Sequence, residues 1–381
     1  MLIGIDGNEA NSKKRVGISE YAYQLLRQFS EFRIQNSEFR IYLKDKPRND
    51  LPDEATSWMY RVITPKRFWT QWRLPLDLYV HKPRPDVFFS PTHYAPRFSP
   101  VPTVISIMDL SYLYFQDMFT TSDLYQLRRW TAYSVKRAKK ILTISKSSKN
   151  DIMKEYKVPE DRVVVTYPGI KDSVTLSPHV YGMSQLQSKY QISENFILFV
   201  GTLQPRKNIA RLIEAFAITL NNAENNAELR KKKDLELVII GKKGWLYEEI
   251  LEAPEKFGVK ERVKFLDSVG DEELAIFYQQ ALCYVLPSLY EGFGLPVLEA
   301  MQHGCPVITS KISSLPEAGG DAAIYVDPGD VDDIAQKMMK LISDEALRKK
   351  LIEKGKKQVT KFSWEKTARE TLKVLEEVAK G

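Results

Sequence analysis

Short runs of apolar residues recur along the chain, and stretches with the spacing of amphipathic helices separate them. Uninterrupted runs rich in Val, Ile and Leu predict strands that are buried on both faces, as in parallel sheets with helices on each side. Both halves of the chain carry such a set, so the pattern predicts α/β architecture twice. The predicted strands lie within 1–10, 87–91, 103–110, 140–145 and 163–169, and within 196–202, 235–241, 263–269, 283–288, 306–310 and 323–328.

The length of 381 residues exceeds that of one ordinary core, and chains of this size usually form two domains. A polar stretch without clear periodicity, residues 170–195, separates the two sets of strands. We therefore predict a linker there, a boundary near residue 172, and domains over 1–172 and 173–363 with a cleft between them. The pattern of residues 364–381 predicts an amphipathic C-terminal helix with Ser363 as its N-cap. This helix packs either on the C-terminal domain or, after crossing back, on the N-terminal domain.

The composition is that of a globular protein, with 43% hydrophobic and 28% charged residues. No window approaches the roughly 18 continuous apolar residues that a membrane span needs. Residues 1–10 lack the basic and apolar regions of a signal peptide. Cys283 and Cys305 lie beside apolar runs and have no metal-ligand spacing, which favours two buried thiols. These features together favour a cytoplasmic protein.

The net charge of +7 is concentrated in two basic runs, 134–140 and 230–234. Such runs are usually solvated faces, but they can also contact anionic lipid or a phosphorylated ligand. Nucleic acid is the weakest of the three interpretations, because no recognised nucleic-acid-binding motif accompanies the charge. The sequence does not indicate an oligomeric state.

The loop EGFGLP, which follows the predicted strand at 283–288, is suited to ligand binding. In open parallel sheets, ligands bind beyond the carboxyl ends of the strands. The glycines let backbone amides approach a ligand, and Pro296 suits the first turn of a helix over 295–303, whose start is an anion site. Glu291 and Glu299 flank this start. Because carboxylates repel an anion, the partners that suit them are neutral hydroxyls of a sugar or a ribose.

The loop after 196–202 supplies positive charge through Arg206 and Lys207. A guanidinium fork and an ammonium group suit a diphosphate that becomes more negative as a bond to it breaks. Asn208 is expected to cap the helix that follows. An isolated Arg-Lys pair is more often a solvated surface, but its occurrence with EGFGLP in one half favours a site. Gly17, before the first helix, is either a third approach to an anion or a hydroxyl, or an ordinary turn.

Several motifs together resemble one enzyme family. The second half resembles the C-terminal half of retaining glycosyltransferases of family 4, which have the two-domain GT-B fold, in FVGTLQPRKNIARLIEAF, VIIGKKGW, SLYEGFGLPVLEAMQHGCPVITSKISSLPEAGGDAAIYVDP and FSWEKTA. The first half resembles the same family more loosely in GISEYA, SIMDLSYL, TISKSSKNDI and VVVTYPGI. The resemblance covers nearly the whole chain. It implies two Rossmann-like domains that face a cleft, the first binding the acceptor and the second binding the nucleotide sugar.

The resemblance also implies roles for the residues of these loops. Arg206 and Lys207 would neutralise the diphosphate leaving group, so neither a metal ion nor another cofactor is expected. Glu291 would bind hydroxyls of the transferred hexose, and Glu299 would bind those of the ribose. The other expected donor contacts are the backbone amides of Phe293, Gly294 and Leu295, the segment Asp267, Ser268 and Val269 near the base, and Gly17.

The acceptor is expected to bind mainly to the N-terminal domain, near Gly17 and Asp109. Many family members carry His-Asp where this chain has Met108-Asp109. Met108 can neither donate nor accept a proton, so it cannot replace that imidazole. His93, at the end of a neighbouring predicted strand, is a candidate substitute, or else a structural or rim residue.

The implied activity is retaining transfer of a hexose by a front-face reaction, in which the leaving phosphate helps to take the acceptor proton. The phrases SPTHYAP and MDLSYL most resemble mannosyltransferases, which favours GDP-mannose over UDP-glucose as the donor. The acceptor would be a glycan or a lipid-linked sugar. The basic run 134–140 and the aromatic-basic segment 66–73 suit peripheral contact with an anionic membrane at its inner face, unless Trp69 and Trp72 are packing residues.

Other classes of protein stay open as alternatives. A glycoside hydrolase would use two carboxylates about 5 to 10 Å apart and would not need the Arg-Lys pair. A nucleotide-sugar epimerase of the same fold would turn over its donor without an acceptor, and a non-catalytic protein would only bind the sugar nucleotide. A dinucleotide oxidoreductase is disfavoured, because the first strand leads into GIDGNEAN rather than G-x-G-x-x-G.

Overall fold

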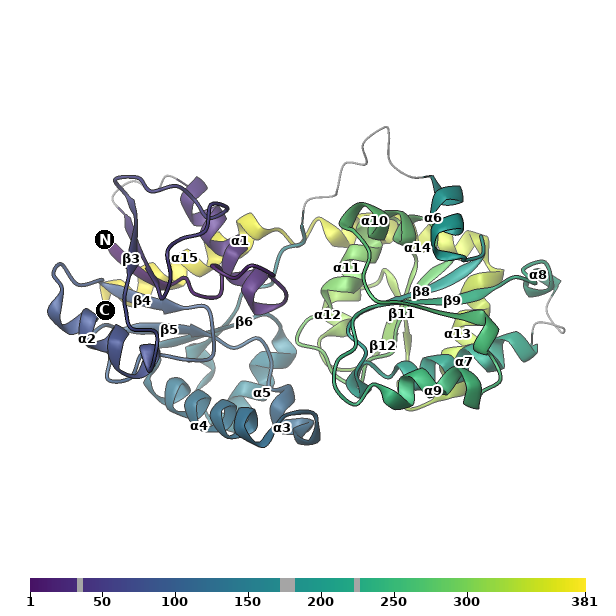
Figure 1. Cartoon of the computed structure of the whole chain (residues 1–381), viewed down its shortest axis with the longest axis horizontal. Coiled ribbons are helices and arrows are strands. Elements are labelled where there is room, and N and C mark those ends of the chain that lie inside the picture. Colours follow the sequence, from purple (N-terminus) through teal and green to yellow (C-terminus); the bar gives the residue numbers. More distant parts are fainter. Residues whose placement is uncertain (33–36, 172–181, 223–226) are drawn as a thin grey trace. The chain divides into compact units, whose positions relative to one another are not determined.

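The chain divides into two compact units in a computed structural model that describes residues 1–32, 37–171, 182–222 and 227–381 (Figure 1). Unit 1 comprises Met1–Gly169 and Phe362–Gly381, and unit 2 comprises Ile170–Lys361. The boundary predicted near residue 172 lies outside the described residues. The linker prediction over 170–195 is wrong in its second part, because Met183–Tyr190 form a helix, α6.

Unit 1 is built on a seven-stranded sheet with the order β3-β2-β1-β4-β5-β6-β7, in which every neighbouring pair is parallel. The direction of strand addition reverses between β1 and β4. The strands are β1 Leu2–Asp6, β2 Glu38–Leu43, β3 Trp58–Val62, β4 Val87–Ser90, β5 Thr103–Ser106, β6 Lys140–Thr143 and β7 Val163–Val165. The helices are α1 Ile18–Glu31, a π-helical turn η1 Trp69–Arg73, α2 Leu74–Val80, α3 Ser111–Tyr114, α4 Thr121–Arg137, α5 Lys146–Tyr156 and α15 Trp364–Lys380.

Strands β2 and β3 are missing from the strands predicted from the apolar pattern. Their sequences, EFRIYL and WMYRV, interrupt the apolar positions with charged residues. For β3 the reason is its place in the sheet, since it is an edge strand and its burial decreases from Trp58 to the exposed Val62. Strand β2 lies between β1 and β3, and its polar residues Glu38 and Arg40 are the two that are not buried. A strand at the edge of a sheet does not need to be apolar at every position.

Adjacent residues of the central strands pack into different cores on the two faces of the sheet. Phe89 packs with residues of α1 and α15, whereas Phe88 packs with residues of η1 and α2. Val104 and Ile105 divide between two cores in the same way. Side chains alternate between the faces along a strand, so a sheet covered on both faces needs apolar residues at consecutive positions. This requirement is the physical origin of the runs in the sequence.

The C-terminal helix α15 belongs to unit 1, where it packs against α1, β4, β5 and β6. The predicted N-cap is confirmed, because Ser363 Oγ accepts a hydrogen bond from the backbone N–H of Lys366 at 3.2 Å. Thr367 Oγ1 donates to the backbone oxygen of Tyr167 at 2.6 Å. A Cβ at Gly169 would lie 2.1 Å from the backbone nitrogen of Trp364, so only glycine fits where the chain passes the start of this helix.

Unit 2 is built on a six-stranded parallel sheet with the order β10-β9-β8-β11-β12-β13, whose direction of strand addition reverses between β8 and β11. Helix α7 packs against α9 and α13, and α11 packs against α12 and α14. The strands are β8 Phe196–Val200, β9 Glu236–Ile240, β10 Val263–Leu266, β11 Cys283–Leu286, β12 Val307–Ser310 and β13 Ala323–Val326. The remaining helices are α7 Ile209–Asn221, α8 Ala227–Arg230, α9 Glu248–Lys256, α10 Asp271–Gln280, α11 Leu295–Gln302, α12 Leu315–Gly319, α13 Val331–Ser343 and α14 Glu345–Val359.

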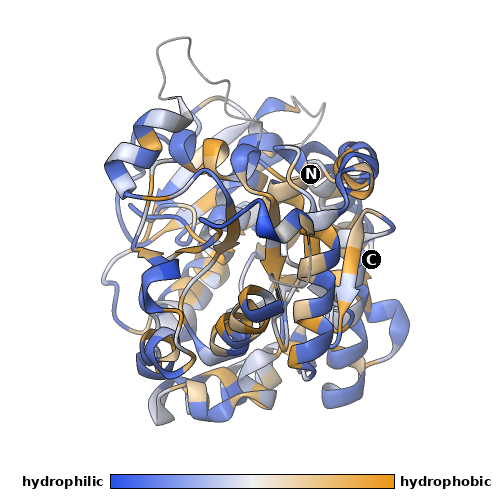
Figure 2. Cartoon of the chain, turned by 90° about the vertical axis from the view of Figure 1, so that its right-hand side faces the viewer, coloured by the Kyte–Doolittle hydropathy of each residue, from blue (hydrophilic) through white to orange (hydrophobic). Residues whose placement is uncertain are grey.

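The prediction of α/β architecture with two parallel sheets is confirmed. Hydrophobic residues lie along the strands and on the sides of the helices that face them, and hydrophilic residues lie outside (Figure 2). Cys283 and Cys305 are both buried free thiols, as predicted. No helix in the described part of the chain combines the length and hydropathy that a bilayer crossing requires.

We predict that Leu375→Ala on α15 lowers the free energy of unfolding of unit 1 by about 2 to 5 kcal/mol, because Leu375 is fully buried and its removal leaves a cavity. Urea unfolding followed by tryptophan fluorescence measures this, since every tryptophan except Trp245 belongs to unit 1. Lys373→Ala, at an exposed position of the same helix, is the matched control. Equal effects of the two substitutions would contradict the assignment of α15 to the core of unit 1.

Candidate functional site

Two loops of unit 2 bring oppositely charged side chains together. Arg206 and Lys207 lie in a 3-10 turn (Pro205–Lys207) after β8, and Glu291 lies in the loop between β11 and α11. Because β8 and β11 are neighbours where the strand order reverses, the loops at their carboxyl ends are adjacent. Lys207 Nζ donates to Glu291 Oε1 at 2.6 Å, and Arg206 Nη1 donates to Oε2 at 3.1 Å. The three predicted residues therefore form one cluster, which we call the charge cluster.

The charge cluster is buried, with Glu291 7% and Lys207 8% exposed. Burial alone would raise the pKa of Glu291, but the charges of Lys207 and Arg206 and hydrogen bonds from Lys207 and Ser288 lower it to about 2. Glu291 is therefore ionised at neutral pH. Two cations and one anion leave the cluster with one net positive charge, which suits a site for an anionic ligand.

Three serines support Glu291 and were not predicted from the sequence. Ser288 Oγ donates to Glu291 Oε1 at 2.7 Å. Ser313 Oγ and Ser314 Oγ donate to the backbone oxygen of Glu291 at 2.6 and 2.8 Å. In sequence each is an ordinary loop serine, and Ser313 and Ser314 come from the loop after β12. Only the packing of neighbouring loops shows that Ser288 holds the carboxylate of Glu291 while Ser313 and Ser314 hold its backbone.

The start of α11 has the geometry predicted from EGFGLP. Gly294 is the N-cap residue with φ 101°, and Pro296 lies in the first turn. A Cβ at Gly294 would also lie 2.7 Å from Leu315 Cδ2, so both backbone conformation and space require glycine. The Phe293 side chain is buried, 3% exposed, and Leu295 begins the helix. The first backbone N–H groups of a helix are an anion site, and here they follow directly on the charge cluster.

Glu299 has different surroundings from Glu291. It lies on α11 one turn beyond Leu295, and its Oε2 accepts a hydrogen bond from the Tyr278 hydroxyl at 3.3 Å. Burial raises the pKa of Glu299, although the Tyr278 hydrogen bond opposes this. Tyr278, which the sequence did not single out, is itself stacked on the His303 ring at 5.9 Å. A carboxylate bound by a neutral phenol is suited to neutral hydroxyls rather than to phosphate.

The segment Asp267, Ser268 and Val269 follows β10, the edge strand that lies beyond β9 from β8. Asp267 and Ser268 are exposed, and Val269 is half-buried. The segment therefore lies at the same edge of the sheet as the charge cluster but after a strand two positions away.

The predicted acceptor residues belong to unit 1, at the carboxyl ends of its strands. Gly17 is the N-cap residue of α1 with φ 54°, in the connection after β1. His93 follows β4, the neighbour of β1 at the reversal of strand order. Asp109 follows β5, and its Oδ1 accepts a hydrogen bond from the backbone N–H of Ser111 at 2.8 Å. These loops occupy the same topological position in unit 1 as the charge cluster does in unit 2.

His93 and Met108 have separate surroundings. The His93 ring lies 6.1 Å from that of Tyr112, and its buried Nδ1 has no hydrogen-bond partner among the described residues. Burial lowers the pKa of His93, and the charge of Asp109 acts in the opposite direction. Met108 packs against the core of α1 and α15, and its backbone oxygen accepts a hydrogen bond from Ser148 Oγ at 2.9 Å. Met108 is thus half-buried against that core, whereas Nδ1 of His93 is buried.

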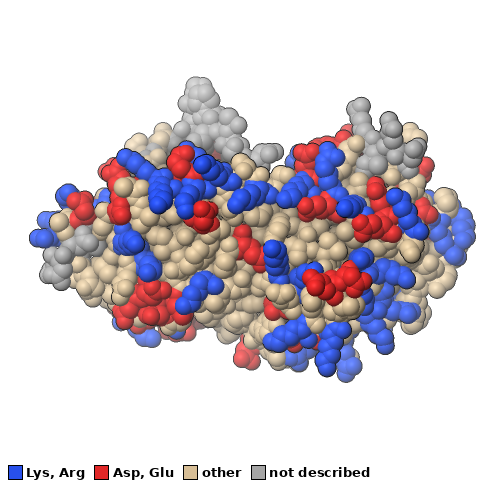
Figure 3. Space-filling view, turned by 180° about the vertical axis from the view of Figure 1, so that it is seen from behind, with Lys and Arg blue, Asp and Glu red and all other residues tan. Residues whose placement is uncertain are grey.

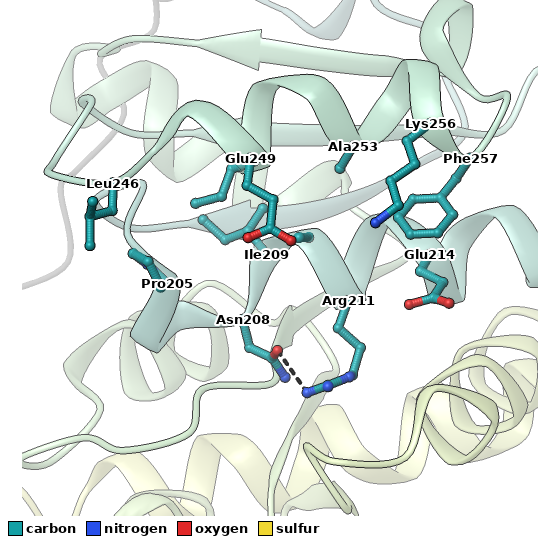
Figure 4. A pocket seen from close by; sticks show the side chains of 12 residues that line it. Pro205, Asn208, Ile209, Arg211, Glu214, Leu246, Glu249, Ala253, Lys256 and Phe257 are labelled. Atoms are coloured by element: carbon teal, nitrogen blue, oxygen red, sulfur yellow. Dashed lines mark hydrogen bonds between the residues drawn. The ribbon is translucent and has the colours of Figure 1, made fainter. Parts of the chain in front are cut away.

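Asn208 is the N-cap residue of α7, as predicted, but its side chain does not cap the helix. Asn208 has φ 61°, outside the extended region that lets an N-cap side chain reach the helix amides. Its Nδ2 instead donates to the backbone oxygens of Pro287 at 3.0 Å and Pro328 at 2.8 Å, and its Oδ1 accepts from Arg211 (Figure 4). Asn208 therefore ties the loop after β8 to the loops after β11 and β13.

A pocket of about 200 Å³ lies between α7 and α9 (Figure 4). Pro205 and Asn208 contribute to its lining, but Arg206, Lys207 and Glu291 do not. It is therefore distinct from the charge cluster, which we take as the candidate site because its geometry and charge suit a ligand. No group of three or more His, Cys, Asp and Glu side chains among the described residues is arranged to hold a metal ion.

Comparisons with known proteins agree with this fold. Residues 16–174 match the model for Glycosyltransferase Family 4, and residues 185–358 match that for Glycosyl transferases group 1. The chain is 31% identical to O-antigen chain mannosyltransferase B of Escherichia coli over 82% of this chain and 78% of that protein. It is 33% identical to the serotype-specific mannosyltransferase WbdA of Escherichia coli over 61% of this chain, which spans only 28% of WbdA.

The fold is similar to that of HepE from Anabaena, whose structure was solved with UDP and glucose. The TM-score is 0.71 at 17% identity, over 98% of this chain and 99% of HepE. The two parallel-sheet units have the GT-B fold. The family models and the relative at 31% identity show that the chain is a glycosyltransferase. The chain belongs to glycosyltransferase family 4 and is similar to its mannosyltransferases.

We predict that Glu291→Gln destabilises unit 2 at neutral pH and has less effect in acid. A carboxyl whose pKa falls from 4.5 to about 2 on folding contributes stability that is present above pH 4.5 and is lost as the pH falls towards 2. The difference in the free energy of unfolding between wild type and variant should therefore shrink by about 3 kcal/mol over this range, at about 1.4 kcal/mol per pKa unit.

Urea unfolding of unit 2 can be followed by labelling Cys283 and Cys305, two buried thiols that both belong to this unit. The label is a disulfide reagent that reacts in acid. Glu252→Gln, at an exposed position of α9, is the control and should show no comparable pH dependence. A difference that is the same at pH 6 and near pH 2 would show that Glu291 is not ion-paired in the folded protein.

Proposed function

We propose that this glycosyltransferase moves a mannosyl residue from GDP-mannose to a glycan or lipid-linked sugar acceptor, with retention of configuration and without a metal ion. The observation that carries the proposal is the buried charge cluster of Arg206, Lys207 and Glu291 beside the start of α11. The names of the relatives at 31% and 33% identity, both mannosyltransferases, support mannose as the sugar. The buried free thiols fit a reducing compartment, so we assign the enzyme to the cytoplasm.

In this proposal the donor binds along the carboxyl edge of the unit 2 sheet. Its diphosphate accepts hydrogen bonds from Arg206 and Lys207 and from the backbone amides at Phe293, Gly294 and Leu295. Lys207 Nζ has three N–H groups and donates one of them to Glu291, so it can serve both partners. Glu291 binds a hexose hydroxyl while it orients the two cations. Glu299 binds the ribose, and the segment Asp267–Val269 lies towards the base.

The proposed reaction breaks the bond between the anomeric carbon and the diphosphate oxygen and forms a bond from that carbon to the acceptor oxygen on the same face. The acceptor proton passes to the leaving phosphate, whose negative charge grows as the bond breaks. Arg206 and Lys207 stabilise that charge, and because Glu291 and Tyr290 already hold them, little reorganisation is needed. The acceptor binds to unit 1 near Gly17 and Asp109, on the side of the sheet where His93 follows β4.

Two alternatives differ in what they do without an acceptor. A nucleotide-sugar hydrolase or epimerase would consume the donor alone, and a non-catalytic protein would bind it without any turnover. Because a net positive site also binds the diphosphate of an intact donor, turnover of the donor with and without an acceptor separates these classes.

We predict that mannose is transferred from GDP-mannose in the presence of EDTA, and that the new linkage keeps the α configuration of the donor. Nuclear magnetic resonance of the product measures the configuration, with UDP-glucose, UDP-N-acetylglucosamine and donor-free reactions as controls. Glu299→Ala should weaken donor binding for every sugar on the same nucleotide. Inversion, abolition of activity by EDTA, or preference for a uridine donor would each refute the corresponding part of the proposal.

We predict that Lys207→Met lowers kcat about 100- to 1000-fold and changes the donor KM far less, because the ammonium stabilises charge that develops in the transition state. Steady-state kinetics with a saturating acceptor separates the two constants. Lys311→Met is the matched control, since Lys311 follows β12 in the same unit but is exposed and forms an ion pair with Asp327 at 3.0 Å. A rise in KM with unchanged kcat would assign Lys207 to ground-state binding alone.

A further inference from the structure

Four buried hydroxyl groups converge in unit 1, on the face of the sheet that α1 and α15 cover. They belong to Tyr21 in α1, Ser106 at the end of β5, Thr166 directly after β7 and Thr371 in α15. Tyr21 is 3% exposed, and the other three residues are fully buried. We call these four residues the hydroxyl cluster. Its members come from four elements that are far apart in the sequence, so only the fold brings them together.

The alternation of side chains along the strands places two of these hydroxyls on the covered face. Val104 lies two residues before Ser106 and packs with the core of α1 and α15. Val164 lies two residues before Thr166 and packs with the same core. Thr166 continues the pairing of β7 with β6, since its backbone N–H donates to the oxygen of Thr143 at 2.8 Å. Because residues two positions apart on a strand share a face, both hydroxyls point towards the helices.

Helices α1 and α15 pack against each other over this face (Figure 1). The ring of Tyr21 lies 6.0 Å from that of Trp364, the first residue of α15, in an edge-to-face arrangement. Thr367 Oγ1 donates to the backbone oxygen of Tyr167, in the chain that follows β7. Thr371 follows Thr367 by one turn on the same side of α15. The two helices therefore bring their hydroxyls to those on the strands.

Three hydroxyls of the cluster surround the fourth, that of Tyr21. Burial raises the pKa of Tyr21, and the other three hydroxyls act in the opposite direction. No charged side chain among the described residues contributes to this shift. None of the four side-chain oxygens has a hydrogen-bond partner within the described part of the chain. The hydroxyls are thus close enough to affect one another but are not bonded directly.

A group of this kind requires a ligand that forms the hydrogen bonds. Each buried hydroxyl without a partner lowers the folding equilibrium constant about 5- to 100-fold, so four of them together would be very costly. Internal water molecules satisfy buried polar groups that lack a protein partner, typically with about two to four hydrogen bonds each. A water molecule can donate and accept hydrogen bonds, and so can every hydroxyl of the cluster.

The ligand that suits the hydroxyl cluster is also neutral. Its four members are uncharged, and an ion without a counter-charge is costly to bury. The surface in Figure 3 differs, because charged side chains of both signs lie interspersed on it. The charge cluster of unit 2 differs as well, since two cations there hold a carboxylate. A water molecule therefore fits the hydroxyl cluster better than a metal ion or an anion does.

We propose that the hydroxyl cluster is an internal hydration site, in which one ordered water molecule joins α15 to α1 and to the ends of β5 and β7. The chain leaves unit 1 after Gly169 and returns to it at Phe362. Thr166 lies three residues before the first of these points, and Thr371 lies nine residues after the second. The water molecule therefore holds together the two segments of unit 1 that lead to and from unit 2.

The same water molecule connects the elements that carry two loops of the candidate acceptor site. Ser106 lies three residues before Asp109. The backbone N–H of Tyr21 donates to the oxygen of Gly17 at 3.0 Å, so Tyr21 lies one turn into the helix that Gly17 begins. The proposal concerns the interior of unit 1 and does not depend on the donor, the acceptor or the reaction.

Removal of single hydroxyls tests the proposal through urea unfolding of the full chain, followed by tryptophan fluorescence. With a bound water molecule, Thr371→Val and Tyr21→Phe should each lower the folding equilibrium constant about fivefold, because each removes a hydrogen bond. In a dry cluster the same substitutions would raise that constant, since each removes an unsatisfied buried group. An increase for either variant would overturn the proposal.

Thr367→Val is the matched control, because Thr367 is also fully buried on α15 but donates to the backbone oxygens of Tyr167 at 2.6 Å and Ser363 at 2.9 Å. Its effect should multiply with that of Tyr21→Phe. The combination of Tyr21→Phe with Thr371→Val should instead lose less than the product of the single effects, by about threefold or more, because both groups bind one water molecule. Independent effects of Tyr21→Phe and Thr371→Val would contradict a shared ligand.

Crystal structures of the full chain and its variants separate a shared water molecule from direct hydrogen bonds, which would give the same coupling. We expect electron density for one water molecule about 2.8 Å from Tyr21 Oη. It should be retained in Thr367→Val and lost when Tyr21→Phe and Thr371→Val are combined. Direct hydrogen bonds between Tyr21 and the other hydroxyls of the cluster, with no water molecule among them, would overturn the proposal.

Discussion

The pairing of Glu291 with Lys207 and Arg206 is the interaction on which the site of this enzyme depends. Each cation by itself would be costly to bury, and so would the carboxylate, but together they remain ionised inside the protein. The pairing exists because β8 and β11 are neighbours where the sheet reverses its strand order. The same contact fixes the loop that leads into α11, so that the backbone amides at the start of that helix and the two cations converge on one place. The site that we propose for a diphosphate thus rests on one ion-paired carboxylate and one feature of topology.

Unit 1 repeats the topology without repeating the chemistry. Its sheet also reverses between two neighbouring strands, β1 and β4, and the loops there carry Gly17 and His93. The loops of the two units differ in charge. In unit 1 burial lowers the pKa of the His93 imidazole, whereas in unit 2 the charge cluster keeps its carboxylate ionised. This difference fits a division of labour in which unit 2 binds the anionic donor and unit 1 binds a neutral, hydroxyl-bearing acceptor.

Much of the site was predictable, and the parts that were not have a common cause. Arg206, Lys207, Glu291 and the glycine at 294 stand out because charge, glycine and proline are unusual directly after buried strands. The supporting side chains do not stand out, since Ser288, Ser313 and Tyr278 are unremarkable residues whose roles arise from contacts across the fold. Asn208 is the opposite case, in which the residue type predicted a role that the side chain does not have. Its backbone is left-handed, so its side chain does not cap the helix but ties three loops together. Trp69 and Trp72 are three positions apart and identical in type, yet one is in the core and the other is exposed.

The sequence by itself determined the α/β class, the central strands, the helix starts at Gly17, Gly294 and Ser363, and the family to which the chain belongs. These features are local or repetitive, so periodicity, backbone preference and motif spacing carry them. Only the tertiary structure decided which loops meet, that β2 and β3 complete the first sheet, that α15 packs in unit 1, and that Glu291 is ion-paired while Glu299 is bound by a phenol. The physical reason is that strand order and the faces of helices bring together residues far apart in the chain. The free energy of a buried charge depends on those neighbours and not on the residues beside it in sequence.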